Sequence, residues 1–167
     1  MQPTSIVTAR LELRPGSRLT YSIAPHDRPA LAAALGVHVP DDWPVEHYDD
    51  EALQWSLRAL DAGDLPAMRY VIERESNSLV GMLGGGTPKD GVLTIGYSIL
   101  PHYRRRGYAS EAVAAIVEWG FARGDVQRII GETYPELVAS ISVLVKNGFR
   151  FVGDGEGERV IRYEKLP

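Results

Sequence analysis

The chain has 167 residues, of which 44% are hydrophobic and 24% charged, with a formal net charge of -4 at pH 7. This length favours one domain over residues 1–167, because two separate cores of half this size would each be marginally stable. The absence of cysteine excludes disulfides, a thiolate nucleophile and cysteine-ligated metals. No segment has the features of a membrane helix or a signal peptide, so we expect a cytoplasmic protein that does not enter a membrane.

The charged residues are unevenly distributed. The 18 basic residues are fifteen arginines and three lysines, and three of the arginines are adjacent at positions 104–106. Affinity for a nucleic-acid backbone comes from many distributed cations, so an acidic chain with one basic cluster argues against a nucleic-acid partner. A local anion site is still compatible with this cluster.

The N-terminal part of the chain predicts short elements in the following order. Residues 10–14 alternate polar and apolar side chains as a half-buried strand does, and residues 18–24 could return as a second strand. Asp27 is a plausible N-cap for a helix that reaches Leu35. Residues 38–48 are expected to form a loop, and a second helix is expected over residues 50–62.

The pattern then changes to strands joined by short turns, which predicts an antiparallel arrangement. These strands are expected at residues 68–73, 79–83 and 92–100. After residue 100 the pattern alternates between helix and strand. The expected elements are a helix at 110–123, a strand at 127–134, a helix at 137–146, and a hairpin formed by 149–152 and 160–163. The sequence therefore predicts an α/β fold, a mixed sheet of about seven strands with about four helices on its faces.

The most informative stretch is residues 95–112, where a strand ends at Pro101, an arginine-rich turn follows, and a long helix opens near Ser110. The first turn of a helix leaves backbone N–H groups without partners, and the helix dipole adds positive potential there. Gly107 allows the backbone to approach a ligand or to adopt positive φ. Neither GxxxxGKS/T nor GxGxxG is present. The alternative is that the arginines form only a solvated surface.

The motif Arg104-x-x-Gly107-x-Ala109, lying between a strand and a helix, resembles the pyrophosphate-binding motif Q/R-x-x-G-x-G/A of the GNAT superfamily of acetyl-CoA-dependent N-acyltransferases. The resemblance continues through residues 131–149. Residues 8–14 are similar to the starts of the branch that contains the ribosomal-protein-alanine acetyltransferases. The likeness therefore extends over nearly the whole chain.

This resemblance implies a GNAT fold with mostly antiparallel strands, a splayed central strand pair, and acetyl-CoA as co-substrate. The pantetheine arm would lie in the gap between the splayed strands, and the pyrophosphate would sit on loop and helix amides. The implied cofactor-binding residues are Ser98, Ile99, Leu100, Arg104, Arg105, Arg106, Gly107, Tyr108, Ala109 and Ser110. The implied reaction is direct acetyl transfer to a primary amine, such as a peptide N-terminus or a small-molecule amine, and it requires no metal.

The catalytic residues are less clearly marked. Compared with relatives, Thr94 stands in place of a glutamate, Leu137 in place of an asparagine, and Leu144 in place of a tyrosine. Ser140 resembles the serine that serves the thiol end of the reaction. Glu132 is the candidate base, alone or through water, because it lies on the strand that leads to the helix of Ser140.

Alternatives to these roles stay open. Ser140 could simply bond a nearby carbonyl, and Glu132 could be a solvated surface residue. The three missing polar groups also permit a non-catalytic module that senses CoA or acyl-CoA with the same fold. The hairpin around residues 149–163 is a place where such folds can pair, so a homodimer is a further expectation.

Overall fold

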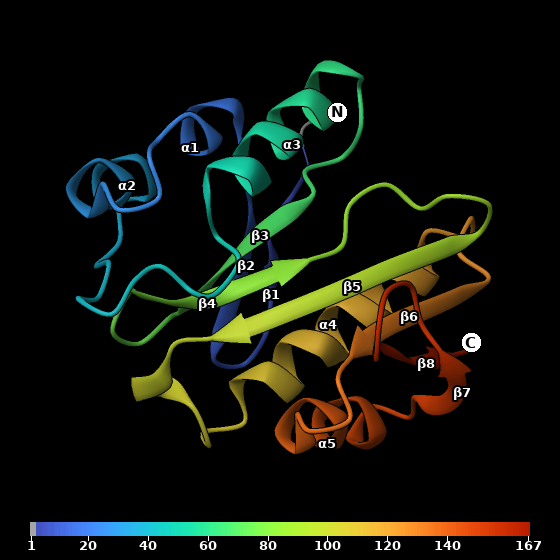
Figure 1. Ribbon diagram of the computed structural model, residues 1–167. Coiled ribbons are helices and arrows are strands. Elements are labelled where there is room, and N and C mark those ends of the chain that lie inside the picture. The colour runs from blue at the N-terminus through green and yellow to red at the C-terminus, as the bar shows by residue number, and fades with distance from the viewer. Residues whose placement is uncertain (1–2) are drawn as a thin grey trace.

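The computed structural model describes residues 3–167, which form an eight-stranded sheet with helices on both faces (Figure 1). The strands are β1 (Ile6–Val7), β2 (Leu11–Pro15), β3 (Met68–Glu73), β4 (Ser78–Gly84), β5 (Val92–Ile99), β6 (Arg128–Thr133), β7 (Arg150–Asp154) and β8 (Ile161–Lys165). The helices are α1 (Arg18–Tyr21), α2 (Arg28–Leu35), α3 (Asp50–Asp61), α4 (Tyr108–Ala122) and α5 (Val138–Lys146). The predicted mixed α/β class is confirmed, with one strand and one helix more than expected.

The strands lie in the order β1-β2-β3-β4-β5-β6-β8-β7. Neighbours from β1 to β5 are antiparallel, as the short turns predict for β3, β4 and β5. Strands β2 and β3 are antiparallel as well, although α1 to α3 lie between them in the chain. Strands β5 and β6 are parallel, because α4 crosses over between them. Strand β8 pairs antiparallel with β6 and carries β7 on its other side, so the C-terminal hairpin extends the sheet to its edge.

The prediction of a strand at residues 18–24 was wrong, because this segment begins with helix α1. Ser17 is its N-cap: the Ser17 hydroxyl accepts a hydrogen bond from the Thr20 amide at 3.2 Å, and the Thr20 hydroxyl accepts one from the Ser17 amide at 2.9 Å. This reciprocal pair satisfies two backbone donors and favours a helical turn over an extended strand. Strand β1 and a 3₁₀ turn at Pro101–Tyr103 were also not expected.

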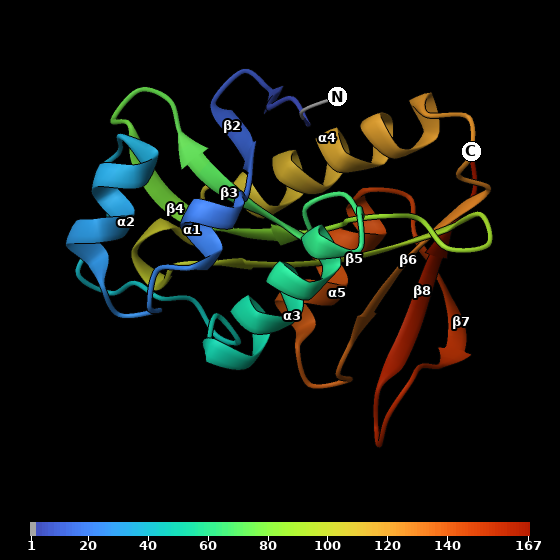
Figure 2. The same ribbon diagram turned by 90° about the horizontal axis from the view of Figure 1, so that it is seen from above.

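Helices cover the two faces of the sheet, and each face has its own apolar core (Figures 1 and 2). Helices α1 to α3 lie on one face, over a core that includes Tyr70, Leu79 and Leu100. Helices α4 and α5 lie on the other face, over a core that includes Leu93, Ile116 and Leu144. The arginine-rich turn at residues 104–107 therefore immediately precedes α4, a helix whose buried side packs in the core.

The two central strands separate partway along their length. Strand β5 pairs with β6 only from Val92 to Ile95, whereas its second half, from Gly96 to Ile99, pairs with β4. Beyond Ile95 the two parallel strands therefore diverge, and backbone groups on their facing edges are left without a ladder partner. This is the splayed pair that the resemblance implies. None of the helices within residues 3–167 is long and apolar enough to cross a membrane.

Candidate functional site

The junction between the arginine-rich loop and α4 presents unpaired backbone donors. Helix α4 begins at Tyr108, earlier than predicted, and its N-cap is Gly107, which has φ of 80° and no side chain to bond the first turn. The amides of Tyr108, Ala109 and Ser110 thus precede the first internal helix bond, which the Glu111 amide donates to the Gly107 carbonyl at 3.0 Å. These donors and the positive end of the helix dipole form a site suited to an anion.

The Cβ position of Gly107 is bordered by one side chain. A Cβ atom added there would meet one neighbour within 4 Å, the Arg10 Nη2 atom at 3.2 Å. Positive φ and close approach are both properties that glycine permits and most other residues do not. The loop thus allows a ligand to contact the backbone directly.

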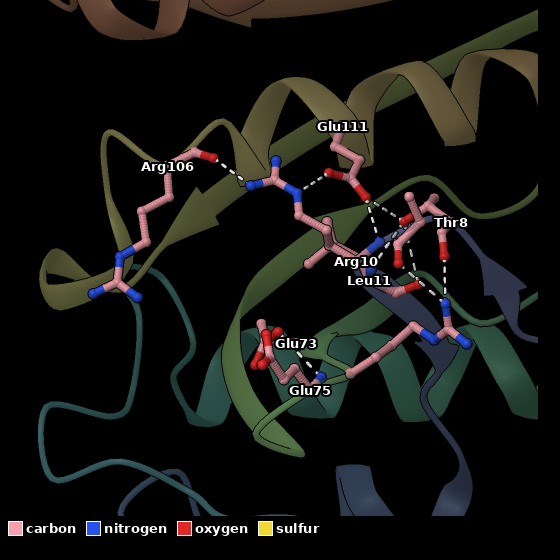
Figure 3. Close-up of polar contacts among 9 residues, drawn as sticks. Thr8, Arg10, Leu11, Glu73, Glu75, Arg106 and Glu111 are labelled. Atoms are coloured by element: carbon pink, nitrogen blue, oxygen red, sulfur yellow. Dashed lines mark hydrogen bonds and ion pairs between the residues drawn. The ribbon is translucent and has the colours of Figure 1, made fainter.

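The three adjacent arginines differ in their contacts. The Arg104 Nε atom donates to the Ile99 carbonyl at 2.9 Å, so this side chain fastens the loop to the end of β5. The Arg106 Nη2 atom donates to the His102 carbonyl at 3.1 Å, and its side chain points away from the first turn of α4 (Figure 3). Arg105 is exposed, with φ of 61°, and within residues 3–167 its side chain makes no ion pair. Arg105 is therefore the arginine least committed to internal contacts.

A network from the N-terminus braces this junction (Figure 3). The Glu111 carboxylate, in the first turn of α4, accepts hydrogen bonds from the Thr8 hydroxyl at 2.6 Å, the Arg10 amide at 2.9 Å and the Arg10 Nε atom at 2.7 Å. The Arg10 Nη1 atom also donates to the Arg106 carbonyl at 2.7 Å. The turn between β1 and β2 thus holds both the loop and the helix start in place.

The pKa of Glu111 is lowered from its ordinary value. Burial alone would raise this pKa, but the hydrogen bonds from Thr8 and Arg10 and the charge of Arg10 outweigh burial. A carboxyl group whose folded-state pKa is depressed stabilises the fold above its unfolded pKa of about 4.3, and this contribution is lost as the pH falls through the folded pKa.

We expect Glu111→Gln to lower the free energy of unfolding by about 1–2 kcal/mol at pH 7, because charge-assisted hydrogen bonds are lost. Urea unfolding of both proteins at pH 7 and at about pH 3 measures the effect, and the difference should shrink at the lower pH. Glu118→Gln, an exposed change on the same helix, is the control and should shift stability by less than about 0.5 kcal/mol. A pH-independent difference would contradict the assigned role of the Glu111 charge.

Tyr97 and Ser140 meet across the gap between the diverging strands. The Tyr97 hydroxyl donates to the Ser140 carbonyl at 2.9 Å and lies 3.2 Å from the Ser140 hydroxyl oxygen. Tyr97 is on the diverging half of β5, and Ser140 is in the first turn of α5. The hydroxyl groups of Tyr97 from β5 and Ser140 from α5 therefore lie together on the face of the sheet that α5 covers. Tyr97 was not among the residues singled out from the sequence.

The other implied pantetheine contacts lie on β5 and just beyond it. Ser98 and Ile99 belong to the half of β5 that pairs with β4. Leu100 is buried, and its amide donates to the Val80 carbonyl at 2.8 Å. The Leu100 N–H group is therefore already used within the sheet.

The Glu132 side chain lies on the face of the sheet opposite to α5, and therefore opposite to Ser140. Its neighbour Gly131 faces α5, since a Cβ atom added to Gly131 would lie 2.8 Å from a Leu144 methyl group, and successive strand residues alternate in direction. The Glu132 Oε1 atom accepts from Arg162 Nε at 2.8 Å and from the Glu156 amide at 3.1 Å. Glu132 is thus a positioned, half-buried carboxylate, and only one of its oxygens is engaged by these contacts.

The three positions where polar groups are missing have different surroundings. Leu144 is 1% exposed and belongs to the core under α5. Thr94 is exposed, on the same face of the sheet as Glu132. Leu137 is the N-cap of α5, is 47% exposed, and gives the helix no side-chain cap. Leu144 is therefore a packing residue, whereas Thr94 and Leu137 lie near the gap without a charged group.

A separate hollow of about 960 Å³ lies on the β3 side of the arginine-rich loop. Its lining combines Asp41 and Asp42 with the turn between β3 and β4 and with Tyr103, Arg106 and Tyr108. No residue of β6 or α5 lines this hollow, so it is distinct from the gap between the splayed strands. Within residues 3–167, no group of three or more histidines and carboxylates is placed to hold a metal ion.

A splayed parallel pair, a glycine-containing arginine loop and an uncapped helix start are the features that the resemblance to the GNAT superfamily implies. A sequence profile described as "Acetyltransferase (GNAT) domain" matches residues 10–150. The chain therefore belongs to the GNAT acetyltransferase family.

Individual relatives match shorter stretches. The chain is 44% identical over 59 residues to the uncharacterized N-acetyltransferase YnaD of Bacillus subtilis, covering 35% of each chain. It is 37% identical over 70 residues to an aminoglycoside N(6')-acetyltransferase type 1 of Salmonella typhimurium, covering 42% of this chain and 44% of that protein. The matches thus span less than half the length of these curated relatives.

Solved structures share the fold over almost the entire length. A complex of RimL, a ribosomal L7/L12 alpha-N-protein acetyltransferase, with coenzyme A superimposes with a TM-score of 0.71 at 19% identity, covering 98% of both chains. At this identity the likeness supports the fold alone.

Proposed function

We propose that this protein, acting as one domain, is an acetyl-CoA-dependent N-acetyltransferase that transfers the acetyl group directly to a primary amine. The observation that carries the proposal is the gap between β5 and β6 beside an uncapped start of α4. Family membership supports the same chemistry. An amide-lined anion site next to an open strand edge fits a ligand with both a pyrophosphate and an extended amide-containing arm.

In this proposal the pyrophosphate binds at the backbone amides from Arg105 to Ser110. Of the three adjacent arginines, Arg105 is the one whose side chain contacts the pyrophosphate. Arg104 and Arg106 act by fixing the loop, since each side chain bonds a nearby carbonyl. The pantetheine arm lies between the diverging strands, along the edge of β5 at Ser98 and Ile99. These contacts bring the thioester to the region between Glu132 and Ser140.

The reaction is the attack of a neutral amine nitrogen on the thioester carbonyl. A C–N bond forms, the C–S bond breaks, and the electron pair of the broken bond goes to sulfur. The nitrogen loses one proton and the sulfur gains one, so acetyl-CoA and the amine give the amide and free CoA. Because the chain contains no cysteine, the transfer cannot pass through an acyl-cysteine. We propose that it takes place in a single ternary complex.

The two faces of the gap suit the two ends of this reaction. Glu132 is proposed as the base for the amine, directly or through water, through the carboxylate oxygen that Arg162 and the Glu156 amide leave available. Ser140, on the opposite face with Tyr97, is proposed to donate a hydrogen bond to the departing sulfur. Because the two groups lie on opposite sides of the thioester, Glu132 can take the proton of the amine while Ser140 donates to the sulfur.

The acceptor belongs to the class of primary amines. Aminoglycoside N(6')-acetyltransferase and the ribosomal L7/L12 alpha-N-protein acetyltransferase, by their names, modify a sugar-bound amine and a protein α-amine. We therefore propose an acceptor panel of aminoglycosides and short peptides with free N-termini, with polyamines added as simple primary amines.

A CoA-binding sensor without turnover is the second candidate, and the exposed Thr94 and the apolar Leu137 favour it. Isothermal titration with acetyl-CoA tests the ligand that both candidates share. We expect binding at micromolar to sub-millimolar concentrations, and no heat at millimolar acetyl-CoA would contradict both. Release of CoA thiol with any amine of the panel separates the enzyme from the sensor.

A further inference from the structure

Tyr97 connects the diverging half of β5 to the first turn of α5. Its hydroxyl donates to the Ser140 carbonyl at 2.9 Å and lies 3.2 Å from the Ser140 hydroxyl oxygen. The ring packs against the core beneath α4 and α5 and is half-buried. A tyrosine in this place therefore reaches across the gap in which the thioester would lie.

The hydrogen positions follow from counting donors. Tyr97 has a single hydroxyl proton, and this proton is used by the Ser140 carbonyl. The contact between the two hydroxyl groups must therefore use the Ser140 proton, with the Tyr97 oxygen as acceptor. The contact with Tyr97 therefore fixes the position of the Ser140 hydroxyl oxygen.

We propose that Tyr97 is a positioning residue that keeps the Ser140 hydroxyl directed at the sulfur of CoA. The inference rests on the proposed function. When the C–S bond breaks, the sulfur carries the electron pair, and a hydroxyl oxygen that is already held in place needs only to turn its O–H bond to donate a hydrogen bond to it. Tyr97 keeps its own bond to the Ser140 carbonyl while the Ser140 O–H bond turns from the Tyr97 oxygen to the sulfur.

The surroundings of Tyr97 favour this role. Burial raises the pKa of its phenol, although the hydrogen bond with Ser140 partly opposes this. The phenol therefore stays protonated through the neutral and mildly alkaline range and remains a donor to the Ser140 carbonyl. No charged side chain contacts the hydroxyl within residues 3–167.

The thiol of bound CoA reports this hydrogen bond without any acceptor. A thiolate absorbs in the ultraviolet, so the absorbance difference between the CoA complex and the complex with desulfo-CoA, followed against pH, gives the pKa of the bound thiol. A donor aimed at sulfur stabilises the thiolate and lowers this pKa. We expect Tyr97→Phe to lower the acid dissociation constant of bound CoA on the order of tenfold relative to the wild type.

A double-mutant cycle separates positioning from general loosening of the fold. Ser140→Ala keeps the carbonyl that Tyr97 bonds but removes the hydroxyl, so it should give a thiol constant as low as Tyr97→Phe or lower. The double variant should match Ser140→Ala, because Tyr97 acts through Ser140. Additive effects of the two changes would overturn the proposal.

Tyr163→Phe is the matched control. Tyr163 is 8% exposed and belongs to the same core, and its hydroxyl is not part of the contacts at the gap. This variant should leave the thiol constant unchanged. If CoA binds but its thiol titrates identically in wild type and Tyr97→Phe, the positioning role is wrong while the proposed function stands. If neither CoA nor desulfo-CoA binds, the proposed function itself fails.

Discussion

Gly107→Asp is expected to raise the dissociation constant of acetyl-CoA by at least about 100-fold, or ~2.7 kcal/mol. The added carboxylate would stand at the uncapped start of α4, where it repels the pyrophosphate and competes for the amides of Ala109 and Ser110. Aspartate tolerates positive φ better than most residues, so the free energy of unfolding should change by only about 1 kcal/mol. Titration calorimetry and urea unfolding measure the two quantities.

Gly107→Asn provides a control for the charge. It has nearly the same size as aspartate and the same tolerance of positive φ, but it carries no charge. We expect Gly107→Asn to raise the dissociation constant of acetyl-CoA by a factor about ten times smaller than the factor for Gly107→Asp. Wild-type affinity in a folded Gly107→Asp protein would show that the anion does not bind at this loop.

Glu132→Gln is expected to lower kcat by at least about 100-fold, as the loss of a general base usually does. The amide oxygen of glutamine can still accept from Arg162 and from the Glu156 amide, so the loop between β7 and β8 should stay in place. The Kd of acetyl-CoA should remain within about twofold, because Glu132 lies on the face of the sheet away from α5. Steady-state kinetics with the best amine of the panel and calorimetry give these values.

Glu136→Gln is the matched control for this change. Glu136 follows the same strand and pairs with Arg159 at 3.2 Å, but its side chain is 53% exposed. Its replacement should change kcat by less than about twofold. Equal losses in the two variants, or full activity in Glu132→Gln, would assign the base to another group or to water.

Local signals in the sequence predicted most of the fold. Asp27 caps α2 as expected, with its carboxylate accepting from the Ala30 amide at 3.1 Å, and Gly36 ends that helix with φ of 67°. The failure at residues 18–24 has a local cause as well, since the capping pair of Ser17 and Thr20 outweighs an alternation that also fits a strand. Strand β1 has only two residues, which is too short for a periodic pattern to emerge.

The candidate site was predictable only in part. The glycine, the arginines and the helix start are consecutive in the sequence, so their grouping could be inferred before the structure. The contacts of Glu111 with Thr8 and Arg10 join segments about 100 residues apart, and no local pattern predicts such a pairing. Tyr97 was overlooked for the same reason, because its importance depends on α5 lying across the gap.

The most direct test of acetyl transfer is to incubate the protein with acetyl-CoA and the amine panel, and to measure CoA thiol and acetylated amine together. We predict that at least one amine yields an amide, identified by mass spectrometry, in a one-to-one ratio with free thiol, and that Gly107→Asp abolishes both at limiting acetyl-CoA. Tight binding of acetyl-CoA with no acetylated product from any amine would contradict catalysis and identify the protein as a CoA-binding module.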